Sequence, residues 1–326
     1  KSAAAMDIDS KQNVNENANL NDNTQQQQDA DGYVASNEYS KSHCHKLIGH
    51  KGSITSLSFY PDRDFFISSS TDNTVRLWAT QISDNDGQQE TGKCLAWYRG
   101  HCFPIWDCAF SPLGLYFVTA SHDRTARLWS TDKGIPLRIF AGHVGDVECV
   151  SFHPNCNYVI TGSCDRTIRL WDIQSGNCVR LMSGHSNSIH DLQVTSDGRC
   201  IVSASLDKTI RVWDIATSEC IAVLNGHTDG VTKIALAHSV NRNAVIIQSN
   251  ESKHAESNPN HNRNDTSIIG NISSFPLIIS SGMDSTVRFW NVNEPEKPLR
   301  KTINTNINVS HLEMTRSNLL MLAGTV

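Results

Sequence analysis

The sequence predicts an all-β protein in which one four-stranded unit is repeated, because three marks recur at fixed spacing. A Gly-His pair occurs five times, at Gly49-His50, Gly100-His101, Gly142-His143, Gly184-His185 and Gly226-His227. The steps between these His residues are 51, 42, 42 and 42 positions. A Trp follows each of the first four after 28 positions and the fifth after 63, and an Asp precedes every such Trp by six. A repeat of this length is typical of a β-propeller blade.

Short strands are expected between these marks. Residues 54–59 alternate in polarity, and residues 158–163 are rich in β-branched and aromatic side chains. Turn signals such as His153-Pro154-Asn155 separate such segments. One small sheet cannot bury both of its faces, so the units are expected to stack in a ring.

The dipeptides Trp171-Asp172 and Trp213-Asp214, with degenerate forms in the other three repeats, resemble the WD-repeat family. The resemblance covers roughly residues 43–326 and implies a β-propeller in which the first strand of each repeat closes the preceding blade. Five repeats are complete, and a sixth from Pro298 to Val326 is partial. We therefore expect sequence upstream of Lys1 to supply another repeat and to close a ring of seven blades.

Two polar stretches interrupt this pattern. Residues 1–40 are rich in Asn and Gln and hold two basic and seven acidic side chains, which accounts for the net charge of −5. We predict that this segment is disordered, that residues 41–326 form the propeller, and that an insertion at about 241–274 is also disordered. The remaining body is neutral, which disfavours binding of nucleic acid by the whole surface. No apolar run reaches even ten residues, so a transmembrane helix is excluded.

A His, a Ser or Thr, an Asp and a Trp recur in every repeat. Ser, His and Asp also form hydrolase triads, but a hydrolase needs one such set in a cleft with an oxyanion hole. Five copies indicate a structural network instead, and the family resemblance implies a hydrogen-bonded tetrad that ends at the Trp indole nitrogen. The predicted tetrads are His50, Ser68, Asp72 and Trp78; His101, Thr119, Asp123 and Trp129; His143, Thr161, Asp165 and Trp171; His185, Ser203, Asp207 and Trp213; and His227, Ser280, Asp284 and Trp290. We predict that the protein is not an enzyme.

Other motifs for chemistry are weak. His43, Cys44 and His45 alternate along a predicted strand, so they do not converge on one metal ion. The sequence has no G-x-x-x-x-G-K-[ST] loop and no G-x-G-x-x-G turn, which leaves nucleotide binding without support. An Arg four positions after each Asp is expected to pack between blades through its aliphatic stem. We predict no catalytic, cofactor or metal site and no small-molecule substrate.

Function is expected where the repeats differ from one another. Trp106 stands where the other repeats have Thr, Glu or His, and three of the five residues after the repeat Asp are basic. Aromatic side chains and Met beside Arg are typical of protein–protein hot spots, although ordinary loop packing also accounts for them. The predicted partner-binding residues, here called the candidate rim, are Phe103, Trp106, His122, Arg124, Arg166, Leu206, Lys208 and Met283.

Several stretches support a closer resemblance. They are Pro104-Ile105-Trp106-Asp107, residues 122–129, residues 136–143, Phe152-His153-Pro154-Asn155 and Ser317-Asn318-Leu319-Leu320. These stretches resemble the WD-repeat TATA-binding-protein-associated factors, the family that supplies the fifth-numbered subunit of the general transcription factor TFIID. In fungi that subunit is shared with the SAGA histone acetyltransferase complex.

This resemblance implies a non-catalytic scaffold in the nucleus. The propeller would dock histone-fold subunits for initiation by RNA polymerase II, with little direct DNA contact and no contact with membranes. Two other functions suit the same fold: a substrate receptor of a ubiquitin ligase, and a reader of histone tails. The basic side chains of Arg124, Arg166 and Lys208 argue against a histone-tail reader, because histone tails are basic.

Overall fold

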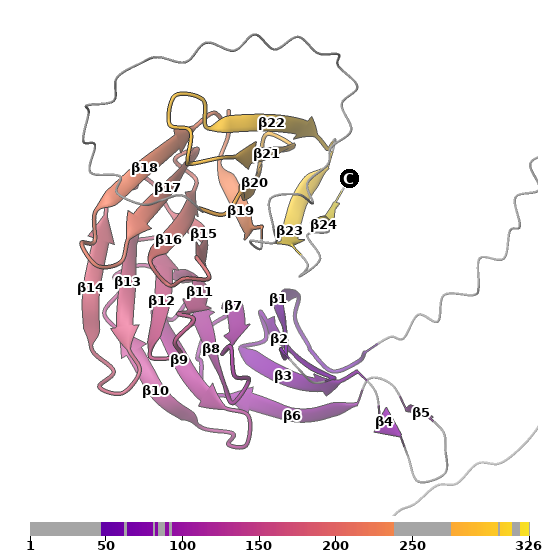
Figure 1. Ribbon diagram of the computed structural model, residues 1–326. Helices are drawn as coiled ribbons and strands as arrows, with labels where there is room; N and C mark the ends of the chain where they lie inside the picture. Colours follow the sequence, from indigo (N-terminus) through magenta and orange to yellow (C-terminus); the bar gives the residue numbers. More distant parts are fainter. Residues whose placement is uncertain are drawn as a thin grey trace, which may run out of the picture. The chain divides into compact units, whose positions relative to one another are not determined.

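The computed structural model describes residues 47–61, 64–80, 82–83, 89–90, 93–237, 275–305, 307–314 and 320–325. The segments predicted to be disordered, 1–40 and about 241–274, lie outside these residues, as do His43, Cys44 and His45. The predicted all-β class is confirmed, because every regular element in the described ranges is a strand. Among the described residues, five four-stranded antiparallel sheets and a final two-stranded sheet follow one another along the chain, and a second two-stranded sheet forms a small hairpin within the first repeat (Figure 1). No helix in the described part of the chain is long and apolar enough to span a membrane.

Each sheet is one blade, and its strands succeed one another from the inside outward. The first blade contains β1 (Ile54–Phe59), β2 (Phe65–Ser70), β3 (Thr74–Ala79) and β6 (Cys94–Arg99). The second contains β7 (Ile105–Phe110), β8 (Tyr116–Ser121), β9 (Thr125–Ser130) and β10 (Pro136–Ala141). The third contains β11 (Val147–Phe152), β12 (Tyr158–Ser163), β13 (Thr167–Asp172) and β14 (Cys178–Ser183).

The remaining sheets repeat this order. The fourth blade contains β15 (Ile189–Val194), β16 (Cys200–Ser205), β17 (Thr209–Asp214) and β18 (Cys220–Asn225). The fifth contains β19 (Val231–Leu236), β20 (Ile278–Gly282), β21 (Thr286–Trp290) and β22 (Leu299–Asn304). The two-stranded sheet pairs β23 (Asn308–Met314) with β24 (Leu320–Thr325), and a small hairpin pairs β4 (Ile82–Ser83) with β5 (Gln89–Glu90).

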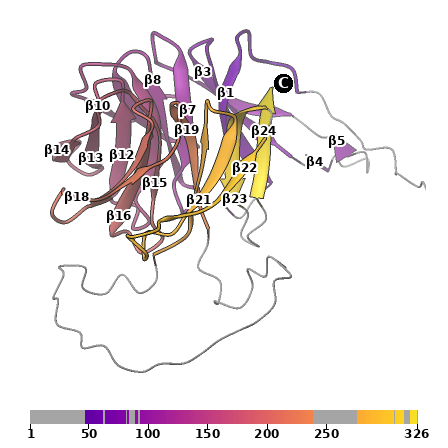
Figure 2. The same cartoon turned by 90° about the horizontal axis from the view of Figure 1, so that it is seen from above.

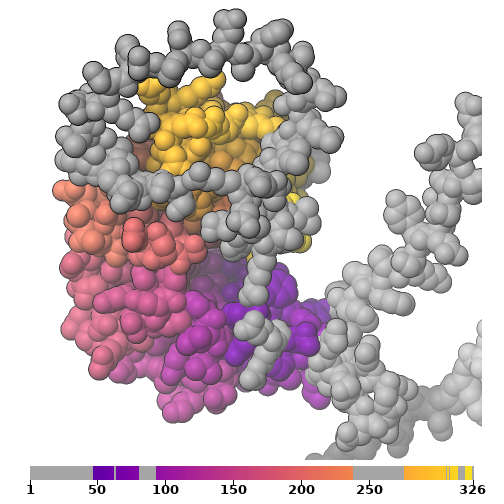
Figure 3. Space-filling model, viewed as in Figure 1, coloured from indigo at the N-terminus to yellow at the C-terminus, as the bar shows by residue number. Residues whose placement is uncertain are grey.

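The blades stack face to face through their inner strands. β1 contacts β7, and the contacts continue through β11, β15 and β19 to β23. The blades therefore follow one another in chain order (Figure 1), and the space-filling view shows the same succession from indigo to yellow (Figure 3). Figure 2 shows the same sheets edge-on. The blades thus bury their faces by stacking on one another, as the sequence predicts.

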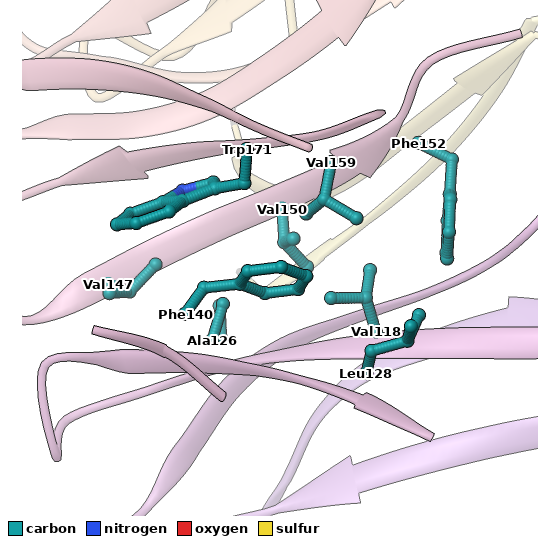
Figure 4. Packing of buried hydrophobic residues seen from close by; sticks show 10 residues of the cluster. Val118, Ala126, Leu128, Phe140, Val147, Val150, Phe152, Val159 and Trp171 are labelled. Carbon is teal, nitrogen blue, oxygen red and sulfur yellow. The ribbon is translucent and has the colours of Figure 1, made fainter. Parts of the chain in front are cut away.

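Apolar side chains fill the space between neighbouring blades. Between the second and third blades, Val118, Leu128 and Phe140 pack against Phe152 and Trp171 (Figure 4). The third strand of each blade alternates, so that Ala126 and Leu128 face the next blade while Trp129 belongs to the core shared with the preceding one. Burial of each large apolar side chain contributes about 1.5–3 kcal/mol, which makes these interfaces the main source of stability.

The two longest connections leave from one rim of the propeller. In an antiparallel blade the first and third strands run in the same direction, so both end at the same rim. The connection from β3 to β6, which carries the β4–β5 hairpin, and the connection from β19 to β20 both start there. The Gly-His turns and the turns that contain the repeat Asp lie at the opposite rim, where the connections are short.

The first blade differs from the others in the exposure of its inner strand. Phe59 is 59% exposed, whereas Phe110, at the same position in the second blade, is only 8% exposed. Ile54 and Leu57 of β1 are exposed as well, although their equivalents Ile105 and Cys108 are buried. The described residues place no blade against this face of β1.

Candidate functional site

Hydrogen bonds join the four tetrad residues in every repeat. The His Nδ1 atom lies 2.6–3.0 Å from an Asp carboxylate oxygen, and the Nε2 atom lies 2.7–2.8 Å from the Ser or Thr hydroxyl. The Trp Nε1–H donates to the same hydroxyl over 2.8–3.0 Å. The network spans two turns of the rim and the third strand of the blade, so it fixes the rim to the sheet.

The tetrad geometry favours structure over catalysis. The Trp N–H can only donate, so the hydroxyl accepts from Trp and donates its own proton to His Nε2. The His is then protonated at Nδ1 and donates to the Asp. In a hydrolase the hydroxyl must be free to attack a substrate, but Thr119 and Thr161 are fully buried and have both hydrogen-bonding roles occupied.

Burial and hydrogen bonding set the protonation states of the tetrads. Burial raises the pKa of Asp123, but hydrogen bonds from His101 and Thr125 outweigh it and lower that pKa to about 2. The balance also lowers the pKa of Asp284 to about 2, where Thr286, Thr228 and His227 donate to the carboxylate. Burial lowers the pKa of His101 and of His227, so both rings are neutral near pH 7.

The recurring Arg packs against the Gly of the Gly-His pair. A Cβ atom at Gly100 would lie 2.9 Å from Arg127 Nη1 and 2.9 Å from Trp129 Cη2, and Gly142, Gly184 and Gly226 show the same close approach. The side chain is therefore held inside the blade, beside the tetrad. These contacts place the guanidinium group beside the tetrad of its own repeat, and the packing between blades through the aliphatic stem stays a prediction.

A β-bulge in each inner strand presents one variable residue. The register shifts between Ile105 and Asp107, so Trp106 is the extra residue of the second blade. Bulges commonly re-aim a side chain next to a functional site. The corresponding residues of the other four blades are Thr55, Glu148, His190 and Thr232.

Three of the candidate rim residues form an aromatic cluster on the second blade. The ring of His122 lies 5.5 Å from that of Phe103 and 6.2 Å from that of Trp106. Phe103 is 52% exposed, and the Nε1 atom of Trp106 is buried without a hydrogen-bond partner among the described residues. His122 Nδ1 is also hydrogen-bonded to the carboxylate of Asp146 in the third blade. The cluster therefore combines an open apolar surface with an acidic neighbour.

Cys164, at the position equivalent to His122, lies in an acidic group on the third blade. Ligand atoms of Asp146, Glu148 and Cys164 all lie within 4.8 Å of one another, which is the spacing of a metal site. The thiol, however, donates a hydrogen bond to Glu148 Oε1 over 3.0 Å. Burial and the Glu148 carboxylate raise the pKa of Cys164 to about 12, so the thiol keeps its proton at neutral pH. Cys164 and Glu148 are therefore joined by a hydrogen bond, while the carboxylate of Asp146 is bonded to His122.

The basic members of the candidate rim occupy turns with a left-handed backbone. Arg124, Arg166 and Lys208 have φ angles of 65°, 69° and 70°, and all three side chains are exposed. Lys208 Nζ donates to the carbonyl of Thr228 over 2.8 Å, so this residue links the fourth blade to the fifth. An Asn at the same position of the first blade, Asn73, donates to the carbonyl of Cys102 in the second.

The other two candidate rim residues lie near the start of the fifth blade. Leu206 packs close to Gly230, where a Cβ atom would lie 2.5 Å from Leu206 Cδ2. The backbone N–H of Met283 donates to the Gly230 carbonyl, and its side chain is exposed. The contacts of the described residues thus bring Phe103, Trp106 and His122 together on the second blade and place Leu206 and Met283 separately, around Gly230. No contact between described side chains joins Arg124 or Arg166 to either group.

Asp146 and Glu148 were not singled out from the sequence. Their contacts cross from one blade to the next or run from strand to turn, so they depend on how the blades stack. Variation between the repeats could have pointed to Asp146 and Glu148, because they occupy two of the positions at which the repeats differ most.

Comparison with known proteins settles the family. The family model described as "WD domain, G-beta repeat" matches residues 41–79, 92–130, 134–172, 176–214 and 263–291. These segments together cover more than half of the chain. The chain belongs to the WD-repeat family. Its five matched segments agree with the five complete repeats predicted from the sequence.

Individual WD-repeat proteins are similar to this chain over shorter stretches. "Transcription initiation factor TFIID subunit 5" of Caenorhabditis elegans is 44% identical over 96 residues, which are 29% of this chain and 13% of that protein. "Small ribosomal subunit protein RACK1" of Dictyostelium discoideum is 37% identical over 93 residues, 28% of this chain and 27% of that protein. "Elongator complex protein 2" of Arabidopsis thaliana is 31% identical over 87 residues, 27% of this chain and 10% of that protein. The matches span about a quarter or less of each relative.

Proposed function

We propose that this chain is a non-catalytic scaffold subunit of a TFIID-type transcription complex, and of a SAGA-type coactivator where the subunit is shared. In this role it acts in the nucleus and docks histone-fold subunits for initiation by RNA polymerase II. It binds no cofactor and no small-molecule substrate, and it makes little direct contact with DNA.

The observation that carries the proposal is the 44% identity to TFIID subunit 5 of Caenorhabditis elegans over 96 residues. The candidate rim supports it, because Phe103, Trp106 and His122 form an open aromatic cluster at the rim where the connections are short. Large aromatic side chains of this kind dominate the energy of protein–protein interfaces. The absence of an enzyme activity is supported by the tetrads, whose hydroxyls are hydrogen-bonded on both sides.

Affinity purification of the tagged protein from nuclear extract, followed by mass spectrometry, tests the proposal. We expect TATA-binding protein and histone-fold factors among the recovered proteins. Recovery of cullin-ligase subunits would contradict the proposal in favour of a ubiquitin-ligase receptor. Recovery of nucleosomes without TATA-binding protein would favour a reader of histone tails.

A double variant tests the aromatic cluster within the same assay. Phe103→Ala with Trp106→Ala should weaken incorporation into the complex while the melting temperature stays near that of the wild type. The matched control is Leu113→Ala with Leu115→Ala, which removes two exposed apolar side chains from the opposite rim. Normal incorporation of the first double variant would contradict the assignment of this cluster as the docking surface.

A further inference from the structure

The first blade carries a pocket that the scaffold function does not use. It has a volume of about 280 Å³ and lies beside β3, β6 and the first Gly-His turn. Its walls carry three cationic side chains, Lys51, Arg76 and Arg99, and the indole ring of Trp97. Asp72, Asn73, Thr74 and His101 complete the lining.

Both guanidinium groups lie against the same indole ring. In the register of β3 and β6, Arg76 is directly opposite Trp97, and Arg99 follows Trp97 two residues later on the same face. The Cζ atom of Arg99 lies 3.6 Å from the centroid of the Trp97 ring, and that of Arg76 lies 5.7 Å from it. Cation–π contacts of this kind hold the guanidinium planes in place while their N–H groups stay available for an acceptor.

These cations have no carboxylate partner among the described residues. In the second and fifth blades the Arg equivalent to Arg76 forms an ion pair with the tetrad Asp, from Arg127 to Asp123 and from Arg288 to Asp284. Arg76 instead approaches the Cys94 thiol, with Nη1 3.7 Å from Sγ. The carboxylate of Asp72 already accepts hydrogen bonds from His50, Thr74 and the backbone of Lys51. The pocket therefore holds an excess of positive charge.

This combination is specific to the first blade. The positions of Trp97 and Arg99 are occupied by Ile139 and Ala141 in the second blade, by Leu181 and Ser183 in the third, and by Val223 and Asn225 in the fourth. Ile139 is 51% exposed although the first blade packs against the second, and Trp97, the equivalent residue of the first blade, is 50% exposed. The position thus stays open to solvent even where the blade before it is present.

We propose that the pocket beside Trp97 binds the carboxylate side chains of an acidic peptide segment on a partner protein. Arg guanidinium groups match the planar carboxylate through paired N–H donors, and the indole supports the aliphatic part of the ligand side chain. The size of the pocket suits one or two side chains. Nucleic acid would need an extended basic track along the surface, which a body with 26 basic and 26 acidic side chains outside residues 1–40 does not supply.

Fluorescence anisotropy with the full 326-residue chain tests this site. The probe is a labelled peptide of ten alternating Asp and Glu residues, and the matched probe carries Asn and Gln at the same positions. The test variant is Trp97→Leu with Arg99→Ser, which installs the residues of the third blade. The control variant is Arg180→Ala, which removes an exposed Arg from the equivalent outer strand of that blade and installs the residue found in the first.

We expect the acidic peptide to bind the wild type and the Arg180→Ala variant equally. The Trp97→Leu/Arg99→Ser variant should lose at least about tenfold in affinity, and the amide peptide should bind at least about tenfold more weakly. If the double variant melts at a lower temperature than the wild type, Arg99→Ser alone serves as the test, because it changes an exposed position. This single variant should also bind the acidic peptide more weakly than the wild type. Unchanged affinity in both Arg99 variants would overturn the proposal. So would equal or tighter binding of a single-stranded oligonucleotide with ten phosphates, because the site would then select charge and not a peptide.

Discussion

The Oδ2 atom of Asp191 lies 2.8 Å from the backbone nitrogen of Ile234, so a side chain of the fourth blade accepts a hydrogen bond from the innermost strand of the fifth. Asp107 has the same relationship to Val150, over 3.0 Å, between the second and third blades. Both Asp residues directly follow the bulged residue of their strand. The carboxylate thereby accepts a hydrogen bond from a backbone N–H group on the innermost strand of the next blade, which has no neighbouring strand on that side. This bond links two blades near the axis.

Replacement of Asp191 should loosen the fourth and fifth blades. Asp191→Ala leaves the Ile234 N–H without its acceptor and removes the carboxylate that raises the pKa of Lys233, so the Lys233 ammonium loses its counter-charge. We expect a loss of about 1–3 kcal/mol in the free energy of unfolding, measured by urea denaturation. Glu219→Ala, which removes an exposed carboxylate from the same blade, should change it by less than about 0.5 kcal/mol. Equal effects of the two variants would show that the Asp191 hydrogen bond adds no stability.

Replacement of a tetrad Asp should destabilise its blade. Asp165→Ala removes the acceptor of His143 Nδ1 and of the backbone N–H of Val144. We expect a loss of about 1–3 kcal/mol in the free energy of unfolding, because the buried His143 ring keeps a donor without a partner. The melting temperature followed by circular dichroism measures this loss. A variant that melts with the wild type would contradict the structural role of the tetrad in the third blade.

Gly162 tests how tightly the third blade packs against the fourth. A Cβ atom there would lie 2.6 Å from Cys149 Sγ and 2.8 Å from Ile189 Cγ2, although the first and second blades have Ser69 and Ala120 at this position. Gly162→Ala should therefore cost about 1–3 kcal/mol through overpacking. Adding Cys149→Ala removes the nearest atom and should recover part of that loss. Additive destabilisation in the double variant would show that Cys149 does not cause the clash.

The protein should lose stability as the pH falls from neutral. Burial lowers the pKa of His101, His190 and His227 in the folded state, so the unfolded chain takes up protons first as the pH drops below about 6.5. A second loss should follow below about 4, because the pKa of Asp123 and of Asp284 is about 2 in the folded state, below the ordinary value of an Asp. Urea denaturation at pH 7.5, 5.5, 4 and 3 measures both steps. A constant free energy of unfolding from pH 7.5 to 5.5 would contradict the first step.

The blades and tetrads could be predicted from the sequence because their contacts lie within one repeat. The distance along the chain from His143 to Asp165 and Trp171 is nearly the same in every regular unit, so the hydrogen-bond partners follow from spacing alone. The contact between His122 and Asp146 could not be predicted in this way, since it joins two repeats and depends on the angle at which their blades stack.

The pocket beside Trp97 also needed the structure. Arg76 and Trp97 are 21 residues apart, and an insertion that contains the β4–β5 hairpin separates their strands. Only the pairing register of β3 and β6 places them opposite each other. Sequence comparison between repeats marks Trp97 and Arg99 as unusual, but it does not reveal that Arg76 lacks the ion pair formed by Arg127.

The open face of β1 makes the stability of this chain depend on its surroundings. Ile54, Leu57 and Phe59 gain apolar burial only when another surface covers them. Any molecule that binds this face in the folded state adds stability by mass action, by about 2.7 kcal/mol when its concentration is a hundred times its Kd. The melting temperature would then rise with the concentration of that molecule. A first blade without a covering partner would unfold locally before the other blades and expose the chain to proteolysis. The concentration of the covering partner would then set the lifetime of the protein in the cell.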